Sequence, residues 1–156
     1  MQSTLEDFKS TLAHALVQLG KITDSDSQKV VSPEKWSKKQ VLGHLIDSAA
    51  NNHQRFVRAQ LGQELAFPGY EQERWVAVQH YQDESWIALV ALWHQYNRHL
   101  LHVMARVPGD QLSRRCAIGD SDPVTLEFLM KDYVVHLKHH LEQIWDKSPS
   151  VYAETV

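Results

Sequence analysis

The sequence offers little with which to cross-link the chain or anchor it in a membrane. Cys116 is the only cysteine, so no internal disulfide can form, which is typical of proteins in a reducing compartment. The first residues lack the basic region and apolar run of a secretory signal, and no stretch reaches the ~18 apolar residues of a membrane span. We therefore expect a cytoplasmic protein with no membrane partner.

Concentrated charge of one sign is also absent. The 16 Lys and Arg residues are scattered along the chain, and the formal net charge is -3 when the histidines are neutral. Proteins that bind nucleic acid usually present a basic patch or stripe. A nucleic-acid partner is therefore not expected.

What remains is an ordinary globular composition. Hydrophobic residues make up 43% of the chain and charged residues 22%, which argues against disorder. A chain of 156 residues fits one domain with a proper core. We expect a single helical domain over residues 1–148 and a loosely ordered tail over residues 149–156.

Apolar residues recur at helical spacing in four long segments. Ser3-x-x-Glu6 and Ser37-x-x-Gln40 match the capping box, in which two side chains satisfy free backbone groups at the start of a helix. Val57 and Ile87 are expected on the buried faces of the second and third helices. The four helices are expected over about residues 3–20, 38–61, 86–107 and 125–145.

Three connections separate these helices. Residues 21–35 are typical of a polar loop, and residues 110–124 of a connection with a short extended segment near Cys116. The first and third connections are long enough to be crossovers. The predicted fold class is all-α, a four-helix bundle that is either up-down or built with long crossover connections.

The second connection, over residues 62–82, is turn-rich and long enough for one helical turn. Loops of this length in a small domain are often functional. Two of its aromatic residues, Tyr70 and Trp75, either line or cover a cavity or simply seal one end of the bundle.

Two of the ten histidines have the spacing of a metal site. Side chains four residues apart lie on the same face of an α-helix, so His136 and His140 can converge on one point. Divalent transition ions bind neutral imidazole, and one helical turn here supplies two ligands. The surrounding residues are apolar, and unpaired imidazoles would be costly in such a buried setting.

A third ligand is expected from the second helix, where His44 is the best candidate. His44, Ser48, Asn51 and Arg55 form a polar line along one face of this helix. This line becomes the wall of a polar pocket if it faces inward, and an ordinary solvated surface if it faces outward.

The other histidines are weaker candidates. His139 is rotated about 100° from its neighbour on an ideal helix, so it cannot easily join the same centre. His94, or the pair His99 and His102, offers a rival source of ligands. The remaining three read as surface or partner-helix residues: His14, His53 and His80.

Taken together, several of these residues resemble the DinB/YfiT-like superfamily of four-helix-bundle metalloproteins. The resemblance comprises Trp36-Ser37, Gly43-His44-Leu45, Asn51, Arg55, Tyr133, His136-x-x-x-His140 and Gln143. It covers nearly the whole chain. It implies one metal ion held by His44, His136 and His140, a polar line that faces inward, and a homodimer.

Ligating imidazoles usually donate their other N–H to a neighbouring acceptor. Asp47, Asp132 and Gln143 each lie three or four residues from one of the three histidines. We therefore expect these side chains to orient the imidazole rings.

Three histidine ligands leave a divalent ion with open positions, as in catalytic sites. The ion can then lower the pKa of bound water to about 7, or the pKa of a bound thiol. By resemblance, the family includes metal-dependent hydrolases and thiol S-transferases that use bacillithiol, mycothiol or glutathione-like cofactors.

The expected function is accordingly a metal-dependent hydrolase or a low-molecular-weight-thiol S-transferase that acts on a small molecule. The expected metal is zinc or nickel (Zn or Ni), and Asn51, Arg55 and Tyr70 are expected to bind the substrate or its anionic group. Two alternatives stay open. One is a non-catalytic metal- or ligand-binding stress-response protein, and the other is a histidine-lined core that holds no metal.

Overall fold

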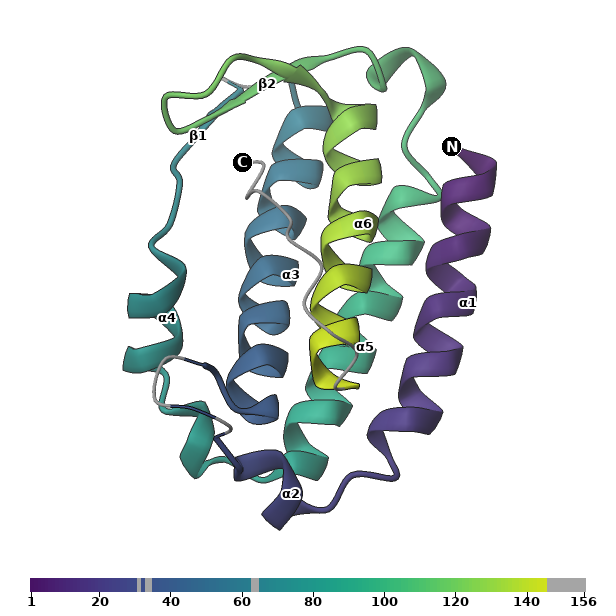
Figure 1. Ribbon diagram of the computed structural model, residues 1–156. Coiled ribbons are helices and arrows are strands. Elements are labelled where there is room, and N and C mark those ends of the chain that lie inside the picture. The colour runs from purple at the N-terminus through teal and green to yellow at the C-terminus, as the bar shows by residue number, and fades with distance from the viewer. Residues whose placement is uncertain (31, 33–34, 63–64, 146–156) are drawn as a thin grey trace.

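Four long helices pack as a bundle in the computed structural model of the protein, which describes residues 1–30, 32, 35–62 and 65–145 (Figure 1). These helices are α1 (Gln2–Leu19), α3 (Lys38–Gln60), α5 (Trp86–Met104) and α6 (Leu126–Ile144). The predicted fold class, a four-helix bundle with long connections, is confirmed. The tail predicted over residues 149–156 lies outside the described residues.

Short elements cover the ends and one side of the bundle. They are α2 (Asp24–Gln28), α4 (Gln72–Val78), the 3-10 helices η1 (Tyr81–Asp83) and η2 (Gly109–Gln111), and the strands β1 (Ala66–Phe67), β2 (Arg115–Ile118) and β3 (Val124–Thr125). The strands form a small sheet in the order β1-β2-β3, with β1 parallel and β3 antiparallel to β2. The extended segment predicted near Cys116 is therefore confirmed. The sheet around it was not predicted, because strands of two residues are too short to show a period in sequence.

The helix directions make the topology unusual for a bundle. Figure 1 shows α3 and α5 running in one direction and α1 and α6 in the other. α3 packs against both α5 and α6, and α1 packs against the same two helices. The crossover that returns along the length of the bundle is the second connection, over residues 61–85, which includes α4, and not the first or the third connection as expected from their lengths. None of the helices in the described part of the chain is both long enough and apolar enough to cross a membrane.

Capping residues determine where two of the helices begin. The Ser37 side chain accepts a hydrogen bond from the backbone N–H of Gln40, whose side chain accepts one from the backbone of Ser37, so this predicted capping box is confirmed. Thr125 caps α6 through the N–H of Phe128. The capping box predicted at Ser3 is wrong. α1 begins at Gln2, so Ser3 lies inside the first turn and lacks the extended backbone of an N-cap.

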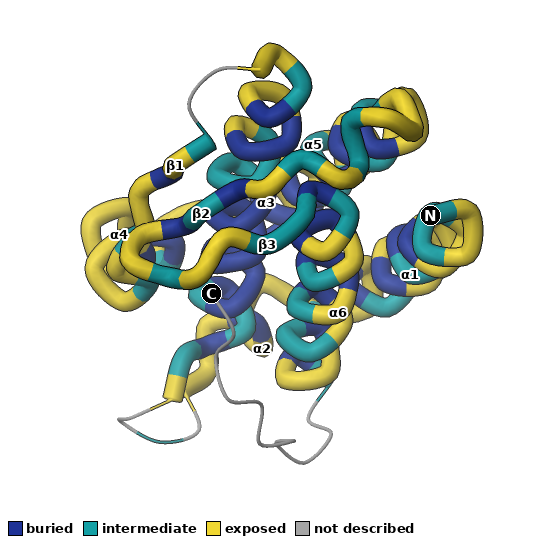
Figure 2. The backbone as a smooth tube through the Cα atoms, turned by 90° about the horizontal axis from the view of Figure 1, so that it is seen from above, coloured by how far each residue is buried: buried dark blue, intermediate teal, exposed yellow. Residues whose placement is uncertain are grey.

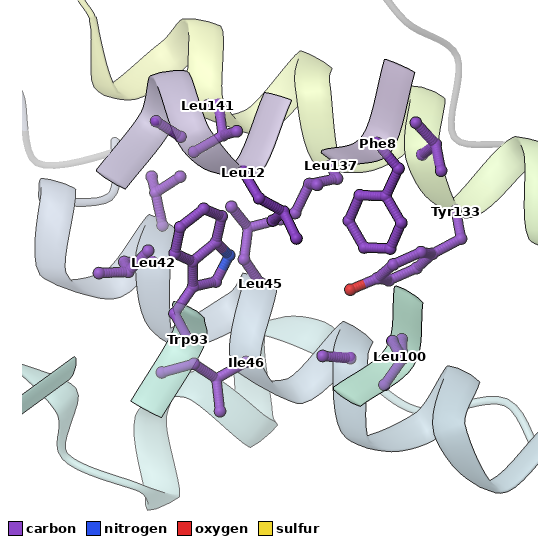
Figure 3. Packing of buried hydrophobic residues seen from close by; sticks show 14 of the residues in the cluster. Phe8, Leu12, Leu42, Leu45, Ile46, Trp93, Leu100, Tyr133, Leu137 and Leu141 are labelled. Carbon is purple, nitrogen blue, oxygen red and sulfur yellow. The ribbon is translucent and has the colours of Figure 1, made fainter. Parts of the chain in front are cut away.

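Apolar side chains from all four long helices meet in the core. Figure 3 shows Phe8 of α1 beside Tyr133 of α6, with the indole of Trp93 among leucines of the neighbouring helices. Phe8 and Tyr133 make an edge-to-face contact with ring centroids 5.8 Å apart. The Tyr133 hydroxyl donates to Oδ1 of fully buried Asn97 at 2.6 Å, which joins α6 to α5 by a polar contact inside the core.

α3 is the helix most enclosed by the others. Figure 2 shows buried residues along much of its length. Two predictions of burial are wrong: Val57 of α3 is 36% exposed and Ile87 of α5 is 80% exposed. Ile87 lies on the same face of α5 as the exposed residues Ala91 and Arg98, because α5 buries the opposite face.

Gly43 allows the segment after α4 to approach α3 closely. A Cβ atom at Gly43 would lie only 2.1 Å from Cδ2 of Tyr81. We expect Gly43→Ala to lower the free energy of unfolding by up to about 2 kcal/mol, because a steric cost of about 1–3 kcal/mol exceeds the ~1 kcal/mol that alanine adds to a helix. Urea denaturation measures this difference.

Gly109→Ala is the matched control, because a Cβ at Gly109 has no heavy atom within 4 Å. The control should denature close to wild type. A Gly43→Ala variant as stable as wild type would show that the packing of Tyr81 against α3 does not require a glycine at position 43.

Candidate metal centre

Three imidazole rings from two helices meet inside the bundle. Nε2 of His136 lies 3.3 Å from Nε2 of His44 and 3.1 Å from Nε2 of His140. The three ligand atoms all lie within 4.8 Å of one another. The structure therefore brings together His44 of α3 with His136 and His140 of α6, as the sequence predicts.

Local structure on each helix directs these rings to one point. His136 and His140 project from successive turns of α6, which packs against α3. The Ser37 capping box fixes the start of α3 two turns before His44. Trp36, just ahead of that cap, packs its indole against the imidazole of His44 with ring centroids 5.3 Å apart.

The three imidazoles are neutral because of burial. His44 is fully buried, and His136 and His140 are half-buried. Burial, reinforced by the neighbouring imidazoles, lowers the pKa of His44 to about 2 and the pKa of His136 to about 3. Burial also lowers the pKa of His140. Neutral imidazole is the form that binds a transition ion.

One of the three expected orienting contacts is present. Nδ1 of His140 lies 3.0 Å from Oε1 of Gln143. An amide oxygen only accepts, so Nδ1 carries the hydrogen and the Nε2 lone pair faces the other two rings. The Gln143 amide in turn donates to Nε2 of His139, so His139 belongs to the surround of the cluster and not to its centre.

The other two expected contacts are wrong. Asp47 instead accepts hydrogen bonds from the Tyr81 hydroxyl at 2.7 Å and from the Gln79 amide at 2.5 Å. Asp132 makes no hydrogen bond to His136, whose Nδ1 has no partner among the described residues, and Nδ1 of His44 has none either. Asp47 lies nearly a full turn beyond His44, and its carboxylate faces the segment that follows α4.

The cluster fits a tetrahedral transition ion. Bonds of about 2.0–2.1 Å from one ion to two imidazole nitrogens place those nitrogens roughly 3.3–3.4 Å apart at a tetrahedral angle. Two of the three Nε2 separations, 3.3 and 3.1 Å, are close to this spacing, and the ligand atoms of the third pair lie within 4.8 Å. In the described part of the chain, no other group of His, Cys, Asp and Glu has suitable geometry, so the rival histidines of α5 do not form a second centre.

A cavity of about 460 Å³ opens beside the cluster. His136 and His140 line it, whereas His44 is enclosed by protein and does not. The walls come from α3, from α6, from the segment before α4 and from the turn between β2 and β3. The polar residues of these walls include Ser48, Asn52, Arg55, Tyr70, Asp120, Ser121, Asp132 and Gln143.

The three residues expected to bind substrate or cofactor lie in different settings. Arg55 and Tyr70 both line the cavity. Asn51 does not, and its amide donates to the backbone oxygen of Asp47. Asn52 lines the cavity instead, although sequence analysis missed it. The sequence could have indicated Asn52, because it lies four residues after Ser48 on the same helix.

Of the two aromatic residues considered in the second connection, one lines the cavity and the other does not. Tyr70 lines the cavity, and its ring lies 5.0 Å from that of Trp75. Trp75 is 39% exposed and does not line the cavity. Tyr70 is thus a wall of the cavity, and Trp75 supports it from the solvent side.

Comparison with known proteins agrees with this fold. A sequence model of the DinB superfamily matches residues 6–144. The chain belongs to the DinB superfamily. No curated protein matches it.

Two solved structures show the same DinB fold. YfiT from Bacillus subtilis, described as a probable metal-dependent hydrolase with an unusual four-helix bundle topology, superposes with a TM-score of 0.81 at 23% identity. That match covers 93% of this chain and 83% of YfiT. A mycothiol-dependent maleylpyruvate isomerase superposes with a TM-score of 0.77 at 14% identity, over 92% of this chain and 60% of the isomerase.

The buried carboxylate of Asp47 should give this DinB protein a measurable pH dependence. Burial raises the pKa of Asp47 above the usual 3.8, although hydrogen bonds from Tyr81 and Gln79 partly oppose that rise. The folded state then binds more protons than the unfolded state, so this group's contribution to stability falls as the pH rises from 3.8 through the raised pKa.

Asp47→Asn should abolish that decline, so that the stability of wild type relative to the variant falls across this pH window and is constant below and above it. Urea denaturation at a series of pH values measures the difference. Asp110→Asn, on exposed η2, controls for the loss of a carboxylate. A difference between wild type and Asp47→Asn that does not vary with pH would contradict the assignment.

Proposed function

We propose that this protein is a metal-dependent enzyme that acts on a small molecule, with His44, His136 and His140 holding a divalent ion, zinc or nickel. One observation carries the proposal: two of the three converging imidazoles line an open cavity. Structural metal sites are closed by a fourth protein ligand, whereas catalytic sites keep one position open. When bound, such an ion supplies a Lewis acid that acidifies a water molecule or a thiol.

The protein's own residues orient the three ligands and exclude water from one side of them. Gln143 fixes the ring of His140 by accepting its Nδ1 hydrogen. Trp36 packs on His44, which is itself closed off from solvent. Access to the reacting centre is therefore confined to the side of His136 and His140, where the cavity lies.

We infer that Asp132 accepts the proton released when the nucleophile is formed. Its carboxylate lines the cavity one turn before His136 and has no hydrogen bond or ion pair to another described residue. Burial raises the pKa of Asp132, which makes it a stronger base than an exposed aspartate. Arg55 and Tyr70, which line the cavity, are proposed to orient the substrate or a thiol cofactor, whereas Asn51, expected in the same role, does not line it.

The nucleophile is water in a hydrolase and a low-molecular-weight thiol in an S-transferase. Each is favoured by one of the similar structures, YfiT as a probable metal-dependent hydrolase and the isomerase as a mycothiol-dependent enzyme. Both reactions use the same three ligands and the same cavity. Cytoplasmic location, a homodimer and the absence of nucleic-acid binding stay predictions.

The competing hypothesis is a non-catalytic metal- or ligand-binding stress-response protein. It requires the ion to be sealed by protein, and the cavity beside His136 and His140 argues against such a seal. A histidine cluster with no metal is the remaining alternative. That alternative leaves the Nδ1 atoms of His44 and His136 buried and unpaired, and only the hydrogen bonds among the three Nε2 atoms hold the rings together.

Metal content tests the ligands directly. We expect wild type to bind about one zinc or nickel ion per chain and the His136→Ala/His140→Ala variant to bind none. At a hundredfold excess of metal over its dissociation constant, binding should stabilise wild type by about 2.7 kcal/mol and leave the double variant unchanged. His14→Ala removes an exposed histidine of α1 and is the control. Equal metal content in wild type and the double variant would eliminate the site.

Turnover separates an enzyme from a binding protein. The metal-loaded protein should either transfer a low-molecular-weight thiol to a generic electrophile or hydrolyse esters or amides, and chelation should abolish the activity. Asp132→Asn should retain the metal and lose about 10²–10⁴ in rate, as expected for a lost general base. Asp110→Asn should match wild type. Metal-loaded protein that is inactive in every assay would favour the binding hypothesis.

A further inference from the structure

Arg55 is a buried cation with no partner among the described residues. Its side chain is 6% exposed, yet it makes no hydrogen bond or ion pair within that part of the chain. Lys39, the other buried cation of α3, pairs with Asp24 at 3.0 Å and donates to the backbone oxygen of Glu84. Of the two buried cations of this helix, Lys39 is therefore paired within the protein and Arg55 is not.

An unpaired buried charge is unfavourable for folding. A charge moved out of water loses solvation that only a counter-charge or hydrogen bonds can restore. Burial lowers the pKa of Arg55, but a guanidinium stays protonated at neutral pH. No hydrogen bond or ion pair from the described residues compensates this positive charge, and Arg55 lines the cavity, where a ligand can reach it.

Arg55 lines the same cavity as the histidine cluster. It follows His44 by eleven residues on α3, which is about three turns and a rise of roughly 16 Å on nearly the same face. Long side chains on a helix lean towards its N-terminus, so the guanidinium lies on the order of 10–15 Å from the imidazoles. The cavity therefore has a metal-binding end and a cationic end.

A neutral donor stands beside this cation. Tyr70 lines the same cavity, and burial with the charge of Asp47 raises the pKa of its hydroxyl to about 12, although the charge of Arg55 and a hydrogen bond with Ser48 oppose that rise. Tyr70 is thus a protonated donor at neutral pH. A guanidinium with a phenol O–H beside it binds an anionic oxygen group well.

The charge around the cavity favours a singly charged anion. Arg55 is the only lining residue with a permanent positive charge among those described, and Asp120 and Asp132 also line the walls. Phosphate sites generally combine several cations or backbone N–H groups, whereas one arginine matches one carboxylate in a two-bond contact.

We propose that the substrate, or the thiol that acts with it, carries a carboxylate that Arg55 binds at the far end of the cavity from the three histidines. This inference rests on the proposed function, because it takes the histidine cluster as the reacting end. It defines the ligand class as elongated monocarboxylates whose reacting group and carboxylate are separated by the length of the cavity.

A series of thiol carboxylates of increasing length tests the proposal. Cobalt(II)-loaded protein is titrated with mercaptoacetate, mercaptohexanoate, mercaptooctanoate and mercaptoundecanoate, each with the thiol at the chain end. Binding of the thiolate to cobalt, with loss of its proton to the buffer, gives an absorption band. Each carboxylate is compared with the mercaptoalcohol of equal length.

The longer carboxylates should bind wild type about 10–100-fold more tightly than their alcohols, whereas mercaptoacetate is too short to reach Arg55 and should show little preference for charge. Arg55→Met should bind cobalt normally and lose the preference. Arg58→Met is the matched control, because Arg58 is exposed on the same helix and its side chain is bonded, among the described residues, to Gln54 alone.

A second measurement needs no metal. In chelator-treated protein without ligand, Arg55→Met should melt on the order of 3–6 °C above wild type, because it removes an unpaired buried charge and keeps most of the side-chain volume. Octanoate should raise the melting temperature of metal-free wild type and of Arg58→Met more than octanol does. It should have no such advantage in Arg55→Met.

The possible failures are distinguishable. A cobalt–thiolate band of equal strength with carboxylates and alcohols would overturn the carboxylate site and leave the metal site standing. Absence of any cobalt binding in wild type would overturn the proposed function, and the octanoate comparison would still decide the role of Arg55. An Arg55→Met variant less stable than wild type, with octanoate binding unchanged, would show that Arg55 is structural.

Discussion

The packing of α3 against α6 is the contact on which the rest of the structure depends. It brings a fully buried His44 from one helix against His136 and His140 from the other, with Nε2 of His44 3.3 Å from Nε2 of His136. Desolvation holds these rings neutral, and neutrality turns three adjacent imidazoles into a ligand set. The crossover over residues 61–85 then supplies Tyr70 to the cavity beside them.

Polar groups are satisfied differently in the core and around the cavity. Asn97 and Lys39 are buried, and each has well-placed partners in the protein. His44 and Arg55 are also buried, yet the Nδ1 of His44 and the guanidinium of Arg55 have none among the described residues. Unsatisfied groups cost stability, and natural proteins tend to retain such conflicts at functional sites. Around this cavity, the clustered Nε2 atoms are complementary to a metal ion and the Arg55 guanidinium to an anion.

Prediction from sequence succeeded where the cause was local. The Ser37 capping box starts α3, and the four-residue spacing of His136 and His140 places both rings on one face of α6. Prediction failed where the burial or the hydrogen bonds of a residue depend on a distant element. Ile87 has the same apolar character as its buried neighbours, but the direction in which α5 packs exposes it. Asp47 is near His44 in sequence, but Tyr81 and Gln79 from the crossover determine its hydrogen bonds.

The sequence by itself determined the four helices, the starts of α3 and α6, and the identity of the clustered histidines, because helical periodicity and capping act within a few residues. The tertiary structure alone decided that α3 and α5 run in the same direction, that Asn52 lines the cavity, and that Arg55 is buried without a partner. These features depend on distant segments, chiefly the crossover and the turn between β2 and β3. Their approach removes water from a polar helix face that would otherwise be an ordinary solvated surface.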